Sequence, residues 1–136
     1  MTLKVPDDSE LILLDVLRGN WGDLTLRLYQ NDHTPSDDDT VADYAEADFS
    51  GYDAIPLLEA NWSVATTEAG KAMTSYEEQT FEHDGGAVSN SIYGYYVVNA
   101  ADELLWAERA AGAPLNMAAG GSQIKITPKF TLASEF

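Results

Sequence analysis

The acidic run Asp37-Asp38-Asp39, with Asp43 close behind it, is the segment whose residue types come nearest to a ligand-binding site. Hard cations such as Ca²⁺ bind through several oxygen ligands, which carboxylates supply. The run lacks the central glycine and the twelfth-position glutamate of an EF-hand loop. Consecutive side chains in an extended chain also point in different directions. We therefore expect a solvated acidic loop, and keep Asp37, Asp39 and Asp43 as candidate calcium ligands.

The other titratable residues do not form a recognisable catalytic set. His33 and His83 have no HExxH spacing and are not one helical turn apart, so we expect solvated loop side chains. The carboxylate pairs Glu77-Glu78 and Asp102-Glu103 are sequence neighbours, which rarely converge on one substrate. The sequence has no GxSxG nucleophile motif and no GxxxxGK[ST] or GxGxxG phosphate-binding motif. These patterns predict a non-enzymatic protein without a cofactor.

Four aromatic residues, Trp21, Tyr52, Trp62 and Trp106, are large enough to form a platform for a sugar ring. Such residues more often pack in a core or at an oligomer contact, which is the interpretation we favour. The sugar platform stays open as an alternative. The candidate partner-binding residues, including positions from the two terminal segments, are Trp21, Trp62, Thr2, Leu3 and Phe136.

Two strands with a turn between them are expected to form the centre of the fold. Ile92 to Val98 is dense in aromatic and β-branched residues, and neither alternating face is polar, which predicts a strand covered on both sides. Asn99 to Asp102 has turn chemistry, and a partner strand is predicted near residues 103–108. Leu24 to Asn31 alternates leucine with polar residues and predicts a third strand. The predicted buried residues are Leu26, Leu28, Tyr95, Val97 and Trp106.

Helical signals are confined to the first third of the chain. Residues 8–18 carry a leucine repeat at i, i+3 and i+6, with a capping box at Asp7 and Glu10 before it and Gly19 after it. Residues 41–49 predict a turn or two of helix. Further strands are expected near residues 72–82 and 123–132, the second interrupted by Pro128 at an edge or bulge. The pattern predicts an antiparallel β-sandwich or jelly-roll, with a single domain over residues 1–136 and an extended arm at residues 1–6.

Composition restricts the possible partners. The 136 residues carry a net charge of −16 and contain no cysteine. A surface this acidic repels phosphate groups, so we expect no binding to nucleic acid or to anionic membranes. The chain has no apolar run long enough for a transmembrane helix, and its first residues lack a signal-peptide pattern. We expect a well-solvated acidic surface, with complementarity to a basic partner or to cations as the alternative.

Two short motifs carry a family resemblance. A leucine-alternating strand enters an N-x-x-T-P loop at Asn31, Thr34 and Pro35, and an acidic, aromatic stretch then ends in F-x-G-Y from Phe49 to Tyr52. With YGYYVV, LLWAERA and ITPKFTLA further along, the chain resembles small virion structural proteins of tailed bacteriophages. The resemblance extends from about Leu11 to Leu132.

The resemblance implies a β-rich module on a phage particle, and the preferred role is that of a capsid cement or decoration protein. Its expected partner is the major capsid protein, and its expected location is the capsid surface of the virion, after synthesis in the host cytoplasm. We expect a homo-oligomer, with a trimer preferred and a dimer open. The alternatives are a tail or baseplate component, including a receptor-binding module, and a carbohydrate-binding domain.

Overall fold

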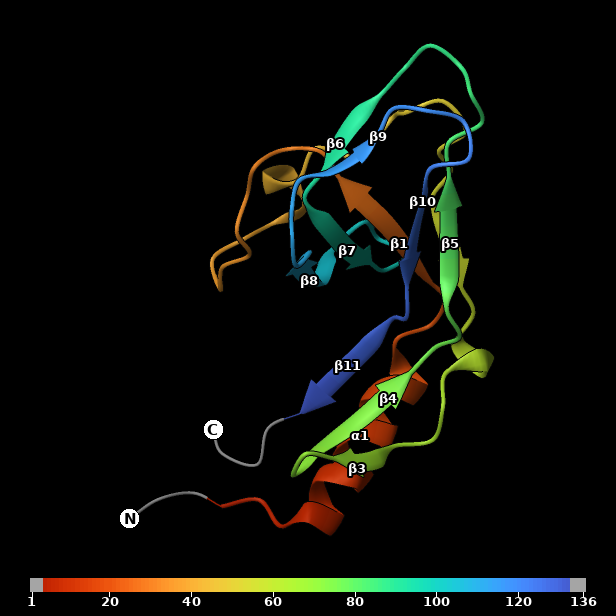
Figure 1. Cartoon of the computed structure of the whole chain (residues 1–136). Helices are drawn as coiled ribbons and strands as arrows, with labels where there is room; N and C mark the ends of the chain where they lie inside the picture. The colour runs from red at the N-terminus through yellow and green to blue at the C-terminus, as the bar shows by residue number, and fades with distance from the viewer. Residues whose placement is uncertain (1–3, 133–136) are drawn as a thin grey trace. The chain divides into compact units, whose positions relative to one another are not determined.

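Strands make up 36% of the chain and helices 16%, so the predicted mainly β class is confirmed. The computed structural model describes residues 4–132 (Figure 1). Its contacts form two compact units. The first takes its described residues from Met1–Gly22, Leu58–Gln79 and Ile126–Phe136, and the second from Asp23–Leu57 and Thr80–Lys125. The single domain expected over residues 1–136 stays a prediction, as does the jelly-roll topology, while the antiparallel sheets are consistent with a sandwich.

The second unit contains a four-stranded antiparallel sheet in the order β2-β1-β7-β8. Its strands are β1 (Leu24–Tyr29), β2 (Ile55–Leu57), β7 (Gly94–Val98) and β8 (Leu104–Arg109). Every residue of β7 is buried, as predicted for a strand covered on both sides. Gly94 is required in β7, because a Cβ there would overlap the Glu108 carbonyl oxygen and the Tyr29 ring.

The two faces of this sheet have separate cores. Leu26, Leu28, Tyr95 and Val97 are buried as predicted. On the other face, a cluster formed by Tyr29, Tyr44, Tyr96 and Val98 is packed against Leu104 and Ala107 of β8. The prediction that Trp106 is buried was wrong: it is half-buried, because β8 is the end strand of the sheet.

Three predicted strands are each divided in two. The strand predicted at residues 92–98 becomes part of β6 (Asn90–Ile92), which pairs with β9 (Leu115–Met117), and β7, which pairs with β1 and β8. The 72–82 and 123–132 strands become β4 (Lys71–Ser75) with β5 (Gln79–Glu82), and β10 (Gln123–Ile126) with β11 (Lys129–Leu132). β5 pairs with β10, whereas β4 pairs with β11. Each strand therefore ends where the chain changes its pairing partner, which for the last pair is near Pro128.

The first unit packs helix α1 (Asp7–Asn20) against a three-stranded antiparallel sheet in the order β11-β4-β3, where β3 is Thr66–Glu68 (Figure 1). Leu14 of the helix packs in a cluster with Ala65 and Ala72. The predicted helix is confirmed, but its capping box was wrong. Pro6 is the N-cap and makes no side-chain cap, and the Glu10 side chain is buried.

Two short 3-10 helices complete the fold, at Val41–Asp43 and Glu59–Asn61. The helix expected over residues 41–49 was therefore too long. The chain is extended at Tyr44, and beyond it the Ala45 carbonyl accepts the Gln30 backbone N–H while the Ala47 N–H donates to the Leu28 carbonyl. Pairing with β1 satisfies these backbone groups in place of a helix.

Candidate functional site

The acidic loop that precedes the first 3-10 helix is held in one conformation by hydrogen bonds to Asp39. Oδ2 of Asp39 accepts from the Tyr44 hydroxyl (2.6 Å), His33 Nε2 (2.8 Å) and the Ser36 backbone N–H (2.9 Å). Because an ionised carboxylate only accepts, these contacts assign the proton of His33 to Nε2. The carboxylate thus joins both ends of the loop to the aromatic cluster of the sheet.

These hydrogen bonds change the pKa values of Asp39 and Tyr44. The bonds from Tyr44, His33 and Ser36 favour the ionised form and lower the pKa of Asp39 from 3.8 to about 2. Burial, followed by the hydrogen bond to the Asp39 carboxylate, raises the pKa of Tyr44 above its usual value. At neutral pH the pair is therefore a phenol donating to a fixed negative charge.

Arg109 attaches the start of the loop to β8. Its Nη2 lies 2.8 Å from Asp32 Oδ1, and its Nη1 donates to the His33 carbonyl oxygen at 3.1 Å. The Tyr29 hydroxyl donates to the same carbonyl at 3.0 Å. The guanidinium carbon also lies 5.3 Å from the centre of the Tyr93 ring. The loop is consequently fixed against the last strand of the sheet.

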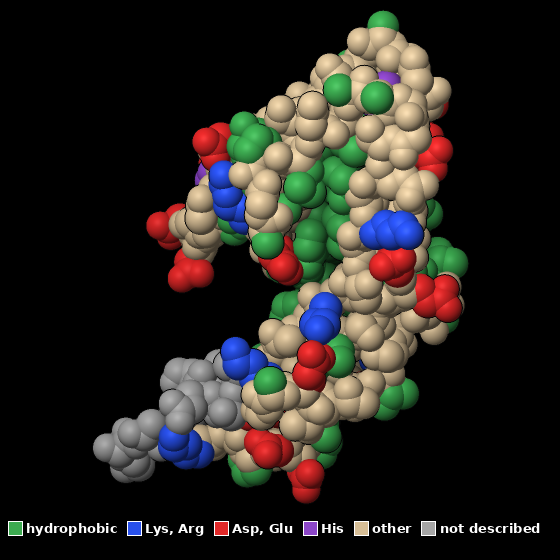
Figure 2. Space-filling model, viewed as in Figure 1, with side chains coloured by type: hydrophobic (Ala, Val, Ile, Leu, Met, Phe, Trp, Pro, Cys, Tyr) green, Lys and Arg blue, Asp and Glu red, His purple; other side chains and the backbone are tan. Residues whose placement is uncertain are grey.

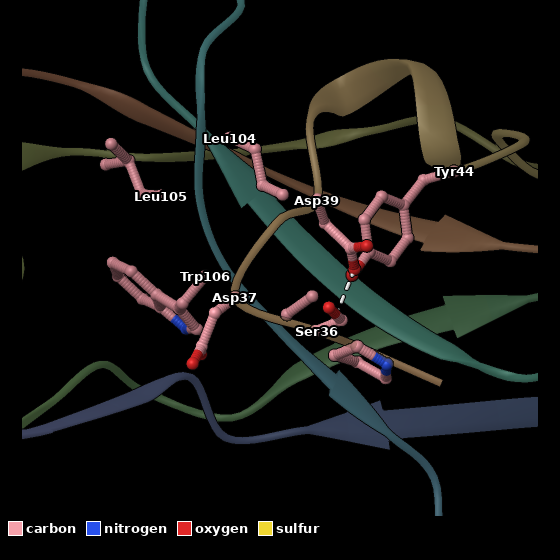
Figure 3. Close-up of a pocket in the computed structure, with 9 residues that line it drawn as sticks. Ser36, Asp37, Asp39, Tyr44, Leu104, Leu105 and Trp106 are labelled. Carbon is pink, nitrogen blue, oxygen red and sulfur yellow. Dashed lines mark hydrogen bonds between the residues drawn. The ribbon is translucent and has the colours of Figure 1, made fainter. Parts of the chain in front are cut away.

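A cavity of about 410 Å³ lies between this loop and β8 (Figure 3). A second cavity of about 350 Å³ shares Asp39 and Leu104 with it and extends to Asp102 and Glu103. None of the described residues that form the two walls is basic. Figure 2 shows acidic side chains at the tip of the same loop, which Figure 1 draws in orange. The residues that line the larger cavity are Pro35, Ser36, Asp37, Asp39, Tyr44, Leu104, Leu105, Trp106 and Ala107. Together the two cavities form an acidic groove along β8.

The groove follows the outer edge of β8. Ala107 lies opposite Tyr96 and Trp106 lies opposite Val97, so their side chains are on opposite faces of the sheet. Residues from both faces can share one cavity only at the edge of the strand. Among residues 4–132, β8 pairs with β7 and with no other strand. Its outward backbone groups therefore face the groove.

The three calcium candidates have separate roles. Asp39 forms the network above, and Asp43 Oδ2 accepts the Thr40 backbone N–H at 2.8 Å in a capping box of the 3-10 helix. Asp37 is exposed and lines the groove. Within residues 4–132, no group of three or more His, Asp or Glu side chains is placed to hold a metal ion. The structure thus brings Asp37 and Asp39 to one cavity, while Asp43 caps the 3-10 helix.

The proposed partner-binding aromatics belong to the core of the first unit. Trp62 is 4% exposed, and Trp21 is half-buried with its ring 5.3 Å from Trp62 and 5.4 Å from Phe130. Trp62 therefore presents very little side-chain surface to a partner in this structure. Thr2, Leu3 and Phe136 lie outside the described residues. Of the four aromatics considered for a sugar platform, only Trp106 lines the described groove.

The prediction that both histidines are solvated was wrong. His83 is buried and stacks on Phe49. Its Nδ1 lies 3.0 Å from the donating Gly85 N–H, so its Nε2 carries the proton and donates to the Val88 carbonyl at 2.8 Å. His33 is half-buried in the Asp39 network. No local pattern distinguishes these two histidines from solvated ones, since their partners come from the folded loops.

Comparison with known proteins adds no further identification. In the part of the chain that is described, no helix has the length and apolar character needed to cross a membrane. No protein-family model, no curated protein and no solved structure matches this chain.

Proposed function

We propose that this chain is a non-enzymatic structural protein of a tailed-bacteriophage particle, a decoration protein that binds the outer capsid shell and stabilises it. Support comes from the sequence resemblance described above and from one structural observation, an apolar helix face that stays exposed among the described residues 4–132. The expected partner is the major capsid protein.

That face belongs to α1 and is formed by Ile12, Leu13, Val16 and Leu17, whose exposed fractions are 65%, 46%, 57% and 42%. We call it the α1 apolar face. The opposite side of the helix packs on the sheet through Leu14. Contiguous exposed aliphatic groups are uncommon on monomeric proteins and are typical of surfaces that another protein covers. This face is the observation that carries the proposal.

The charge of the chain opposes close approach of its copies. At −16 per chain, neighbouring copies on a shell repel each other at low ionic strength. The α1 apolar face would supply an attraction to the shell that does not depend on this charge. A trimer at a local threefold position is the preferred assembly, and a dimer is the alternative.

The test uses particles that lack this protein and receive it back in purified form. We expect binding at a fixed number of copies per shell and a higher melting temperature of the particle. Ile12→Ser with Val16→Ser should weaken binding by at least about a hundredfold, since covering one aliphatic side chain stabilises a contact by about 1.5–3 kcal/mol. Val88→Ser is the matched control, because Val88 is also exposed but lies outside α1.

Two results would contradict the proposal. Binding only to tails would favour the tail or baseplate alternative, and specific binding or hydrolysis of a cell-surface glycan would favour a carbohydrate-active domain. Unchanged binding of the double variant would exclude the α1 apolar face as the contact.

A further inference from the structure

The outer edge of β8 pairs with no strand formed by the described residues. Ala110 donates its backbone N–H to the carbonyl oxygen of Tyr93, the residue before β7 (2.9 Å), so the N–H of Ala110 points toward that strand. Orientation alternates along an antiparallel ladder, so the N–H and C=O of Ala107 point away from β7. Ala107 lines the larger cavity of the groove. An extended segment in the groove would therefore meet an outward donor and acceptor on β8.

The two sides of the groove differ in chemistry. Leu105 and the half-buried indole of Trp106 give it apolar surface. Asp37 and Asp39 supply negative charge, and Asp39 stays ionised because its hydrogen bonds hold its charged form. Figure 3 shows Trp106 and Tyr44 on opposite sides of the β8 ribbon. A segment that fits must be extended, must alternate apolar and polar residues, and must carry a positive charge.

Residues 2–6 of this chain, Thr-Leu-Lys-Val-Pro, have these properties. Thr2 and Lys4 alternate with Leu3 and Val5, so an extended conformation puts the polar pair on one face and the aliphatic pair on the other. The segment holds Lys4 and no acidic residue, in a chain of net charge −16. Pro6, with φ −58° and ψ 149°, is extended and directly precedes α1. The positive charge of residues 2–6 is complementary to the negative charge of the groove.

We propose that the groove between Ser36–Asp39 and the outer edge of β8 binds residues 2–6 of a second copy of this chain as an added strand. Backbone hydrogen bonds to β8 would supply affinity, and the alternating side chains would supply specificity. Lys4 would lie toward the acidic wall, with Leu3 and Val5 toward the indole. The inference deepens the proposed function by naming a contact between copies, and its test needs no phage particle.

The test follows the association of the purified full-length protein by sedimentation velocity over a range of concentrations. We expect the wild-type protein to associate, with a dissociation constant that rises at least about tenfold in Lys4→Glu and in Asp37→Lys. Asp53→Lys is the charge-matched control, since Asp53 is exposed in the same unit and does not line the groove. The double variant Lys4→Glu/Asp37→Lys should recover association, because it exchanges the two charges.

A backbone variant tests strand addition separately from charge. Ala107→Pro removes an N–H that points away from β7 and leaves the ladder with β7 intact, a position where edge strands accept proline. We expect it to abolish association while the circular dichroism spectrum stays that of the wild type. If Ala107→Pro does not fold, the double variant Lys4→Glu/Asp37→Lys still decides whether residues 2–6 bind the groove.

Several outcomes would overturn the inference. One is a wild-type chain that stays monomeric at every concentration, and another is association that neither Lys4→Glu nor Asp37→Lys weakens. A Lys4–Asp37 contact seen by NMR in the monomer would place the arm in its own groove and exclude exchange between copies. A neutral oligosaccharide that shifts the Trp106 indole resonance without dissociating the oligomer would assign the groove to a sugar. If purified copies do not associate through residues 2–6 but the protein still binds phage particles, this inference fails and the proposed function stands.

Discussion

The hydroxyl of Tyr44 donates a 2.6 Å hydrogen bond to Oδ2 of Asp39, and this contact connects the buried aromatic cluster to the acidic groove. The Tyr44 ring stacks on Tyr96 and meets Tyr29 edge to face, both with centroids 5.0 Å apart. One side chain therefore both fills the core and fixes the wall of the groove. The first two predictions depend on this pair.

Tyr44→Phe should preserve the core and release the loop. The ring contacts remain, but Asp39 loses its shortest hydrogen bond, so the pKa of Asp39 should rise from about 2 toward its usual value of 3.8. A carbon-13 NMR titration of the Asp39 carboxyl measures this change. An unchanged Asp39 pKa in a folded Tyr44→Phe protein would show that the hydroxyl does not hold the carboxylate.

Acid should destabilise the protein partly through Asp39. Its folded-state pKa is lowered, so its contribution to stability is present above about pH 4 and is lost as the pH falls toward about 2. The free energy of unfolding of Asp39→Asn should therefore depend less on pH between 4 and 2 than that of the wild type. Asp37→Asn, which alters an exposed neighbouring carboxylate, is the control. Identical pH dependence of wild type and Asp39→Asn would contradict the assignment.

Leu28→Ala should be strongly destabilising, because Leu28 of β1 is fully buried and lies opposite Tyr95 of β7. We expect a loss of about 2–5 kcal/mol in the free energy of unfolding, measured by denaturant titration. Leu58→Ala, at a side chain that is 47% exposed, should change it by about 0.5 kcal/mol or less. A similar loss of free energy of unfolding in the two variants would show that Leu28 is not a core residue.

Replacing Gly94 and Gly19 by alanine should change the stability of the protein in opposite directions. Gly94→Ala places a Cβ against the Glu108 carbonyl oxygen and the Tyr29 ring, so we expect a loss of about 1–3 kcal/mol or more. Gly19→Ala, near the end of α1, meets no atom within 4 Å and should stabilise the helix by about 0.4–1 kcal/mol. Thermal unfolding of both variants provides the measurement, and a neutral Gly94→Ala would contradict the close packing of β7 on β8.

The local patterns of the sequence determined the mainly β class and the main elements. The leucine alternation of β1 and the leucine repeat of α1 are properties of neighbouring residues, and both elements are present close to their predicted bounds. The apolar run of β7 on both faces likewise identified the central strand. These features follow from side-chain periodicity, which needs no knowledge of distant partners.

Only the tertiary structure decided where strands end and which side chains meet. The break at Tyr93 exists because its N–H bonds to Tyr29 while its carbonyl accepts from Ala110, two partners far apart in sequence. The burial of His83 and Trp62 depends on loops and rings from elsewhere in the chain. Asp37 and Trp106 come to one groove only because β8 pairs with β7 and Arg109 holds Asp32. Such contacts are set by long-range pairing, and no local pattern encodes them.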